Sequence, residues 1–214
     1  MSKWLQLLQQ HRAIAVIRCS DFDLAYKMAQ SVAMGGMKLI EITWNSDRPG
    51  ELVARLRKEL PHCTIGTGTI LNLYQLQEAV TAGSQFVVAP YYDSQLLEAS
   101  SRYTIPFVPG ALTPSEIVRA WQQGAEVVKV FPIKSLGGAE YIKCLQGPLS
   151  QIPTIPTGGI TVENARSAID AGAIAVGISS NLFPPKAIAQ RDWAYITART
   201  KLLLDRLYDN RARF

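Results

Sequence analysis

Two ionisable side chains stand in apolar segments where a packed core rarely accepts charge. Glu41 lies in the run LIEIT (39–43), and Lys129 lies in the run VVKVF (127–131). Side chains alternate between the two faces of a strand, so Glu41 shares a face with Thr43, as Lys129 does with Phe131. The isoleucines and valines between them suit a face that packs on helices. We therefore expect the carboxylate and the amine to face one interior.

A lysine and a carboxylate inside one small interior are suited to Schiff-base chemistry. Apolar neighbours favour a neutral amine over an ammonium ion, and a neutral amine can attack a carbonyl carbon. A nearby carboxylate can move protons among carbinolamine, imine and enamine. The alternative is a structural ion pair between two strands, because burying both charges is costly unless they interact. The pattern predicts catalytic roles for Lys129 and Glu41.

Glycine-rich segments with hydroxyl groups predict an anion site. Gly158 and Gly159 follow one apolar run, and Gly177 and Ser179 lie at the end of the next. Glycines let backbone N–H groups approach a phosphate, and hydroxyls complete such a cradle. The pair at 137–138 could add donors. The alternative is that these glycines only end strands.

The chain repeats one architectural unit eight times. Short β-branched or apolar runs start 20 to 27 residues apart, and a stretch with helical spacing follows each. The runs cover 13–18, 39–43, 64–69, 86–89, 107–109, 127–131, 154–156 and 175–178. Eight strand–helix units predict one α/β domain over 1–214, a (β/α)8 TIM barrel with a short extra helix at 3–10. A doubly wound sheet is the competitor, but no Gly-x-Gly-x-x-Gly follows the first run.

Composition narrows the classes of protein. With 214 residues, 48% of them hydrophobic, the chain is long enough for one packed core. Three cysteines leave an odd thiol, and neither a membrane-length apolar run nor a signal peptide is evident, so we expect a cytoplasmic protein without a membrane partner. The stretch 191–214 supplies +3 of the net charge of +5, which is typical of a solvated helix. We expect no nucleic-acid partner.

Metal binding has little support in the sequence. His11 and His62 are the only histidines, and no His-x-x-x-His spacing or paired carboxylate cluster accompanies them. We expect no metal site and no cofactor. Cys144 and Trp121 lie in helical stretches and are expected to pack, whereas Trp44 and Tyr91 follow strands and could wall a pocket.

Five segments together give the chain a specific resemblance. They are EIT at 41–43, GTGTILN at 66–72, VPG at 108–110, KVFP at 129–132 and PTGGI at 156–160. In this order they resemble the 2-keto-3-deoxy-6-phosphogluconate (KDPG) / 4-hydroxy-2-oxoglutarate (KHG) aldolase family, from about 13 to 181. The resemblance implies a metal-independent class I aldolase that cleaves a 2-keto-4-hydroxy acid to pyruvate and an aldehyde, glyceraldehyde 3-phosphate or glyoxylate. It also implies a homotrimer.

The resemblance assigns roles to individual residues. Lys129 would form the imine with the 2-keto acid, and Glu41 would be the general acid and base, acting through a water. The substrate-binding set would be Thr43, Thr69, Pro90, Phe131, Arg18, Asn45 and Arg48, and the phosphate-binding set Gly158, Gly159, Gly177 and Ser179.

Three positions depart from the family pattern. The family has Glu-x-Thr-x-Arg, whereas this chain has Asn45 in place of the arginine that clamps the substrate carboxylate. An amide does not replace a bidentate guanidinium, so Arg18 or Arg48 would have to compensate. Tyr91 replaces a glycine and could narrow the pocket, and Ile178 replaces a glycine in the last loop.

Two other functions remain open at this point. One is a barrel that isomerises or epimerises a sugar phosphate, which would use the glycine loops without an imine. The other is a non-catalytic barrel that binds a sugar-acid phosphate. The aldolase interpretation is favoured because Lys129 and Glu41 occur together.

Overall fold

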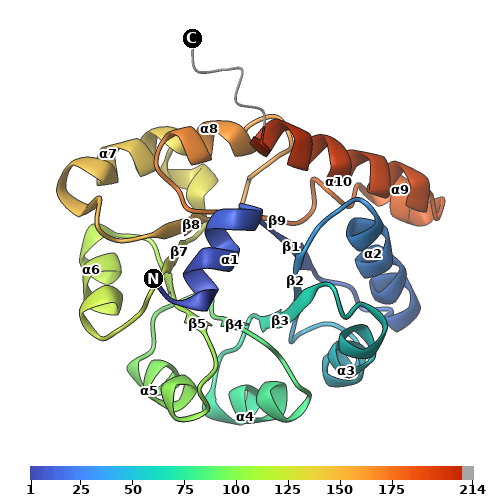
Figure 1. The fold of residues 1–214 in the computed structure, drawn as a ribbon, viewed down its shortest axis with the longest axis horizontal. Coiled ribbons are helices and arrows are strands. Elements are labelled where there is room, and N and C mark those ends of the chain that lie inside the picture. Colours follow the sequence, from blue (N-terminus) through green and yellow to red (C-terminus); the bar gives the residue numbers. More distant parts are fainter. Residues whose placement is uncertain (209–214) are drawn as a thin grey trace.

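The computed structural model describes residues 1–208, which form an α/β fold with parallel sheets (Figure 1). A six-stranded sheet has the order β5-β4-β3-β2-β1-β9, and a three-stranded sheet has the order β6-β7-β8. The strands are β1 (Ala13–Ile17), β2 (Leu39–Thr43), β3 (Thr64–Gly68), β4 (Val87–Val88), β5 (Phe107–Val108), β6 (Gly110–Ala111), β7 (Val128–Val130), β8 (Thr154–Pro156) and β9 (Val176–Ile178). Every ladder is parallel. All eight predicted runs contain a strand.

One helix, α1 (Lys3–His11), precedes the first strand, and the helices that follow the strands form an outer layer in Figure 1. The outer helices are α2 (Phe22–Met34), α3 (Pro49–Glu59), α4 (Leu73–Thr81), α5 (Ser94–Arg102), α6 (Pro114–Gln122), α7 (Ala139–Leu149), α8 (Ala165–Asp170), α9 (Pro185–Ala189) and α10 (Trp193–Tyr208), with a 3₁₀ turn η1 (Ile133–Leu136). Residues 209–214 of the basic stretch at 191–214 lie outside the described residues.

Local capping explains where several helices begin. Thr113 and Glu116 form the reciprocal capping box of α6, with Pro114 at the first helical position. The Asp21 side chain accepts a hydrogen bond from the Leu24 amide at the start of α2. These caps fix the first turns of α6 and α2.

The apolar side chains divide into an outer and an inner core. Ile40, Ile42, Val128 and Val130 belong to the outer core between strands and helices. The inner core contains Leu39, Val127 and nine other residues, among them Trp4 and Leu8 of α1. The predicted alternation along β2 and β7 is therefore confirmed.

Helix α1 lies across the centre of the ring of strands in Figure 1. Its Trp4 ring stacks on Phe86 with centroids 4.8 Å apart, so α1 fills the inner core from the end where β1 begins. Glu41 and Lys129 lie farther along β2 and β7 than the inner-core residues Leu39 and Val127, toward the end where the strands terminate.

The two sheets meet at two places. Pro109 lies between β5 and β6, and an isolated parallel bridge joins Thr157 after β8 to Gly177 in β9. Because proline has no N–H to donate, it interrupts the ladder where the sequence suggested one continuous run.

Two packing predictions are wrong. Cys144 is exposed on α7, and Trp121 on α6 is 40% exposed. Both helices present a solvent face at these positions, which the helical spacing alone did not identify. Among residues 1–208, no helix is long and apolar enough to cross a membrane.

Candidate active site

Glu41 and Lys129 occupy the interior on the two sides of the fold. Glu41 is 2% exposed on β2, and Lys129 is 7% exposed on β7. Burial raises the pKa of the Glu41 carboxyl, and the positive charges of Lys129 and Arg18 oppose this effect. Within residues 1–208, no ion pair of 4.0 Å or less joins the two side chains. The arrangement is therefore unlike the structural ion pair considered as the alternative.

The Glu41 carboxylate packs against β3 at Gly68, a position without a side chain. A Cβ atom on Gly68 would lie 1.7 Å from Glu41 Oε1, so only glycine fits at this point of β3. Glu41 Oε1 is buried and has no hydrogen-bond partner in the described chain. Since buried acceptors in proteins are normally satisfied, this oxygen is available to a ligand or a water molecule.

Phe131 connects the lysine with the glycine segment after β8. Lys129 Nζ lies 5.1 Å from the centroid of the Phe131 ring. An added Cβ on Gly158 would be 3.0 Å from the same ring, so the glycine allows the ring to pack closely. The structure thus brings Lys129, Phe131 and Gly158 together.

Arg18 and Thr69 form a second polar group at the ends of β1 and β3. Arg18 Nη2 donates to Thr69 Oγ1 at 3.5 Å, and the Arg18 charge acts on the buried Glu41. Thr69 has a φ of +59°, which is rare for a β-branched residue and typical of strained functional positions. These contacts place Arg18 beside the predicted catalytic carboxylate.

The loop after β2 supplies less than the sequence suggested. Thr43 is buried and its hydroxyl lies 3.1 Å from that of Ser46, whereas Asn45 is exposed. Arg48 pairs with Glu51 at 3.3 Å, and its guanidinium lies 4.3 Å from the centroid of the Phe22 ring. The structure does not bring Arg48 together with Glu41, because these outer contacts hold it.

The segment after β4 passes close to β6. A Cβ on Gly110 would lie 2.4 Å from the carbonyl oxygen of Pro90. The Tyr91 hydroxyl has two acceptors within reach of its one proton, the Leu71 carbonyl at 3.0 Å and the Asp93 carboxylate at 3.2 Å. These bonds direct Tyr91 toward the loops before α4 and α5, and they give no support to the prediction that it narrows the site.

The glycines of the predicted phosphate site differ in their roles. Gly158 and Gly159 have φ values of +86° and +95°, which favour glycine. Gly177 lies within β9, and the Thr157 hydroxyl oxygen would be 2.3 Å from its Cβ, so close packing accounts for this glycine. Ser179 is half-buried after β9, and its carbonyl accepts from the Leu182 amide. A phosphate role for these four residues stays a prediction.

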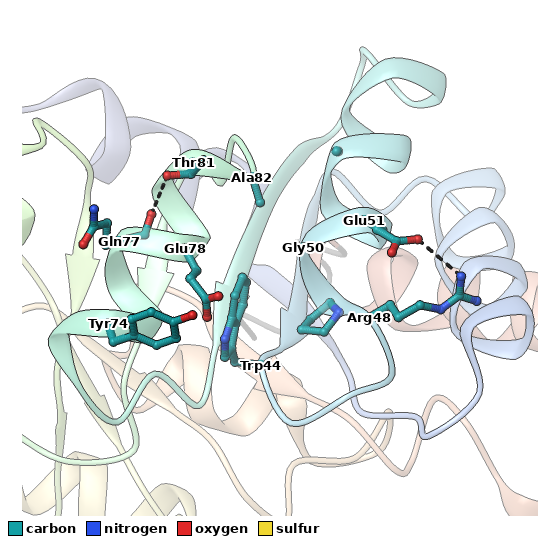
Figure 2. A pocket seen from close by; sticks show the side chains of 11 residues that line it. Trp44, Arg48, Gly50, Glu51, Tyr74, Gln77, Glu78, Thr81 and Ala82 are labelled. Carbon is teal, nitrogen blue, oxygen red and sulfur yellow. Dashed lines mark hydrogen bonds and ion pairs between the residues drawn. The ribbon is translucent and has the colours of Figure 1, made fainter.

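A further cavity lies outside this interior. A groove of about 730 Å³ runs between α3 and α4, lined by Trp44, Arg48, Tyr74, Glu78 and seven other residues (Figure 2). Trp44 does wall a pocket, as the sequence indicated, but neither Glu41 nor Lys129 lines it.

Sequence analysis did not identify the steric role of Gly68. In the sequence, residues 66–69 contribute only to the family resemblance. The signal that could have revealed this contact is that the strand with Gly68 neighbours the strand with Glu41, since Thr43 pairs with Gly68 in the ladder between β2 and β3. Metal ligands do not gather: within residues 1–208, no group of three or more His, Cys, Asp or Glu side chains could hold an ion.

Comparison with known proteins identifies the family. The model of KDPG and KHG aldolases matches residues 5–199. The chain is 33% identical to the KHG/KDPG aldolase of Escherichia coli K12 over 184 residues, 86% of each protein. It is 32% identical to the 2-dehydro-3-deoxy-phosphogluconate aldolase of Dickeya dadantii over 193 residues, 90% of this chain and 91% of that protein.

A solved structure agrees with this assignment. The KDPG aldolase of Legionella pneumophila, with pyruvate captured as a covalent carbinolamine, superposes with a TM-score of 0.86 at 27% identity, over 94% of this chain and 98% of that one. The family match covers far more than half of this sequence. The chain therefore belongs to the KDPG and KHG aldolase family and is an aldehyde-lyase.

Proposed function

We propose that this protein cleaves a 2-keto-4-hydroxy acid, KDPG or KHG, to pyruvate and an aldehyde through an imine on Lys129. The observation that carries the proposal is the burial of Lys129 and Glu41 in one interior without a direct ion pair. The names of the relatives, a KDPG aldolase and a KHG/KDPG aldolase, support the substrate class. Family membership favours this proposal over a sugar-phosphate isomerase or a non-catalytic barrel.

The proposed reaction balances with the residues at hand. Lys129 Nζ attacks the C2 carbonyl carbon, and the carbinolamine loses water to form a protonated imine. Removal of the proton from the C4 hydroxyl then breaks the C3–C4 bond, and the bonding electrons move toward the imine nitrogen to give an enamine. The aldehyde leaves, C3 takes up a proton, and water releases pyruvate. The imine accepts the electrons, so the cleavage requires no metal or further cofactor.

Glu41 is proposed to move the protons in these steps. Burial raises the pKa of its carboxyl, which keeps a proton available closer to neutral pH than an exposed glutamate would. Its unpartnered Oε1 can bind the hydroxyl group or a bridging water. Thr43, at the end of the same strand, lines this part of the site.

Arg18 is proposed to replace the family arginine that is Asn45 here. Its guanidinium reaches Thr69 and acts on Glu41, whereas Arg48 is held by Glu51. Arg18 with Thr69 and the Pro90 segment would hold the pyruvate carboxylate and keto group. We expect Arg18→Ala to raise KM for pyruvate-derived substrates about 10-fold or more, since one charged clamp is lost. The double variant Arg18→Ala/Asn45→Arg should recover part of the increase in KM. The proposed role of Arg18 would be refuted if Arg18→Ala left KM unchanged and the added arginine at position 45 had no effect on it.

The aldehyde half is proposed to lie toward the glycine segments. Phe131 would flank the imine, and the backbone of Gly158 and Gly159, together with Gly177 and Ser179 of the last strand and its loop, would bind a distal phosphate. Gly158 is half-buried and Gly159 is exposed, which supports an accessible backbone there.

Architecture and assembly are proposed on separate observations. The bridge from Thr157 to Gly177 and the short break at Pro109 support one closed eight-stranded barrel, a single domain over 1–214. Exposed Leu71, Leu73 and Tyr74 around the start of α4 support an interface, and we propose a homotrimer, which light scattering tests. The expectation of a cytoplasmic enzyme stays a prediction.

The decisive experiment is borohydride trapping with pyruvate, read by intact mass and peptide mapping. We expect one pyruvyl adduct on Lys129, and none in a folded Lys129→Arg variant. No adduct on the folded native protein, or an adduct on another lysine, would refute the proposal.

A further inference from the structure

We propose that Lys134 binds the distal phosphate of the substrate and selects phosphorylated over unphosphorylated 2-keto-4-hydroxy acids. This inference rests on the proposed function and names the substrate class that the site prefers. Lys134 lies in η1, the turn that follows β7 and its Lys129. Sequence analysis did not single it out, because one exposed lysine in a turn carries no pattern.

Backbone hydrogen bonds hold η1 on the glycine segment after β8. The Ile133 amide donates to the Thr157 carbonyl at 2.9 Å, and the Lys134 amide donates to the Gly158 carbonyl at 3.0 Å. Two consecutive bonds fix the distance and direction between the turn and the segment. The Cα atom of Lys134 is therefore positioned by the same residues that are proposed to bind phosphate.

The Lys134 side chain lies along Gly159. A Cβ atom on Gly159 would be 2.4 Å from Lys134 Cβ and 3.0 Å from Lys134 Cδ, so the absence of a side chain at 159 makes room for the lysine stem. The ammonium group is two bonds beyond Cδ. None of the ion pairs recorded within residues 1–208 involves Lys134, so its charge is available to a ligand.

A pocket of about 220 Å³ adjoins this side chain. Its lining includes Lys134, Gly137, Gly138, Gly159 and Asn164, and no lining residue is acidic. Nothing lies within 4 Å of the Cβ position of Gly137 or Gly138, so no side chain closes the pocket there, and the amides of both glycines donate to the carbonyls of η1. Within residues 1–208, Lys134 is the one charged side chain that lines this pocket. A single cation without a neighbouring carboxylate suits a phosphate group.

A series of contacts runs from Lys129 to the side chain that lines this pocket. Lys129 Nζ is near the Phe131 ring, that ring packs against Gly158, and Gly159 supports Lys134. A substrate joined to Lys129 at C2 would therefore extend past Phe131 toward Lys134. The lysine contacts the end of the substrate that does not react, so it acts on specificity.

The test compares Lys134→Gln with Lys143→Gln, an exposed lysine on α7 whose loss changes the net charge equally. The two substrates are KDPG and 2-keto-3-deoxygluconate, which lacks only the phosphate. In Lys134→Gln we expect kcat/KM for KDPG to fall about 10-fold and that for the unphosphorylated acid to change less than about twofold, because one exposed charge-assisted contact is lost. Lys143→Gln should change neither. Equal losses on both substrates, or no loss on KDPG, would overturn the proposal.

A binding measurement separates this inference from the proposed function. Inorganic phosphate is titrated into native protein and both variants by calorimetry, without turnover. We expect the dissociation constant to rise about 10-fold in Lys134→Gln and to recover in Lys134→Arg, because either cation can pair with phosphate. A weakened Lys134→Gln with no pyruvyl adduct on Lys129 would refute the aldolase mechanism alone. An unchanged dissociation constant would refute the role of Lys134 alone.

Discussion

Replacing Gly68 by alanine tests whether the position of Glu41 controls turnover. The added Cβ would lie 1.7 Å from Glu41 Oε1, 2.4 Å from Cδ and 2.8 Å from Cγ, whereas ordinary contact begins at 3.4 Å. The carboxylate must therefore move by well over 1 Å, within an interior where it is 2% exposed. Displacements of about 1 Å at a catalytic group can cost roughly 10²-fold in rate. We expect kcat of Gly68→Ala to fall by about 10² or more.

The assay follows turnover of KDPG together with pyruvate trapping and thermal unfolding. Gly147→Ala is the matched control, because nothing lies within 4 Å of its Cβ position on α7. Alanine there should leave kcat unchanged and stabilise the helix by up to about 1 kcal/mol. The Gly68 variant should keep a pyruvyl adduct on Lys129 while turnover falls. A folded Gly68→Ala protein with kcat within about threefold of the native value would refute the argument that Glu41 is held in place by this contact.

Three further predictions concern stability and binding. Glu41→Gln should raise the free energy of unfolding at pH 8, because burial raises the pKa of Glu41 and penalises its ionised form. This gain over the native protein should disappear as the pH falls toward the ordinary carboxyl pKa of 4.5. Urea unfolding at several pH values measures the difference. Thr69→Gly should be neutral or stabilising by up to about 1 kcal/mol, since glycine adopts a positive φ without strain, while KM rises because the hydroxyl beside Arg18 is lost. Thr113→Ala should cost about 1 kcal/mol in urea unfolding at unchanged kcat, because the capping box of α6 is removed.

The positions of the strands were predictable because their residues alternate. In β2 and β7 the charged side chains face inward, and valines and isoleucines face the helices, which is the only parity that buries both apolar sets. The break at Pro109 was not predicted. A strand of two residues, such as Gly110–Ala111 in β6, has no periodicity to detect, and its pairing with β7 depends on the tertiary structure.

The candidate site was predictable where strands supply it. Lys129, Glu41 and Phe131 lie on strands or directly after one, so alternation fixes their direction. Arg48 follows no such rule, because it precedes α3, and contacts with Phe22 and Glu51 decide where its side chain goes. The direction of a loop side chain depends on its contacts with other segments, and the sequence does not show which segments lie near it.

The register of the sheet is compatible with the proposed exchange of a cation between two strand ends. Val16 of β1 is paired with Glu41 of β2, so Arg18 and the loop that contains Asn45 emerge at the same edge. A guanidinium from either strand end can therefore approach the space beside Glu41, and the Arg18 charge does act on that carboxyl. The two cations would differ in their direction of approach. Arg18 contacts Thr69, directly after β3, whereas an arginine at position 45 would come from the loop after β2. If Arg18 binds the substrate as proposed, the register allows the anion-binding charge to change its position in the sequence while it keeps its place in the site.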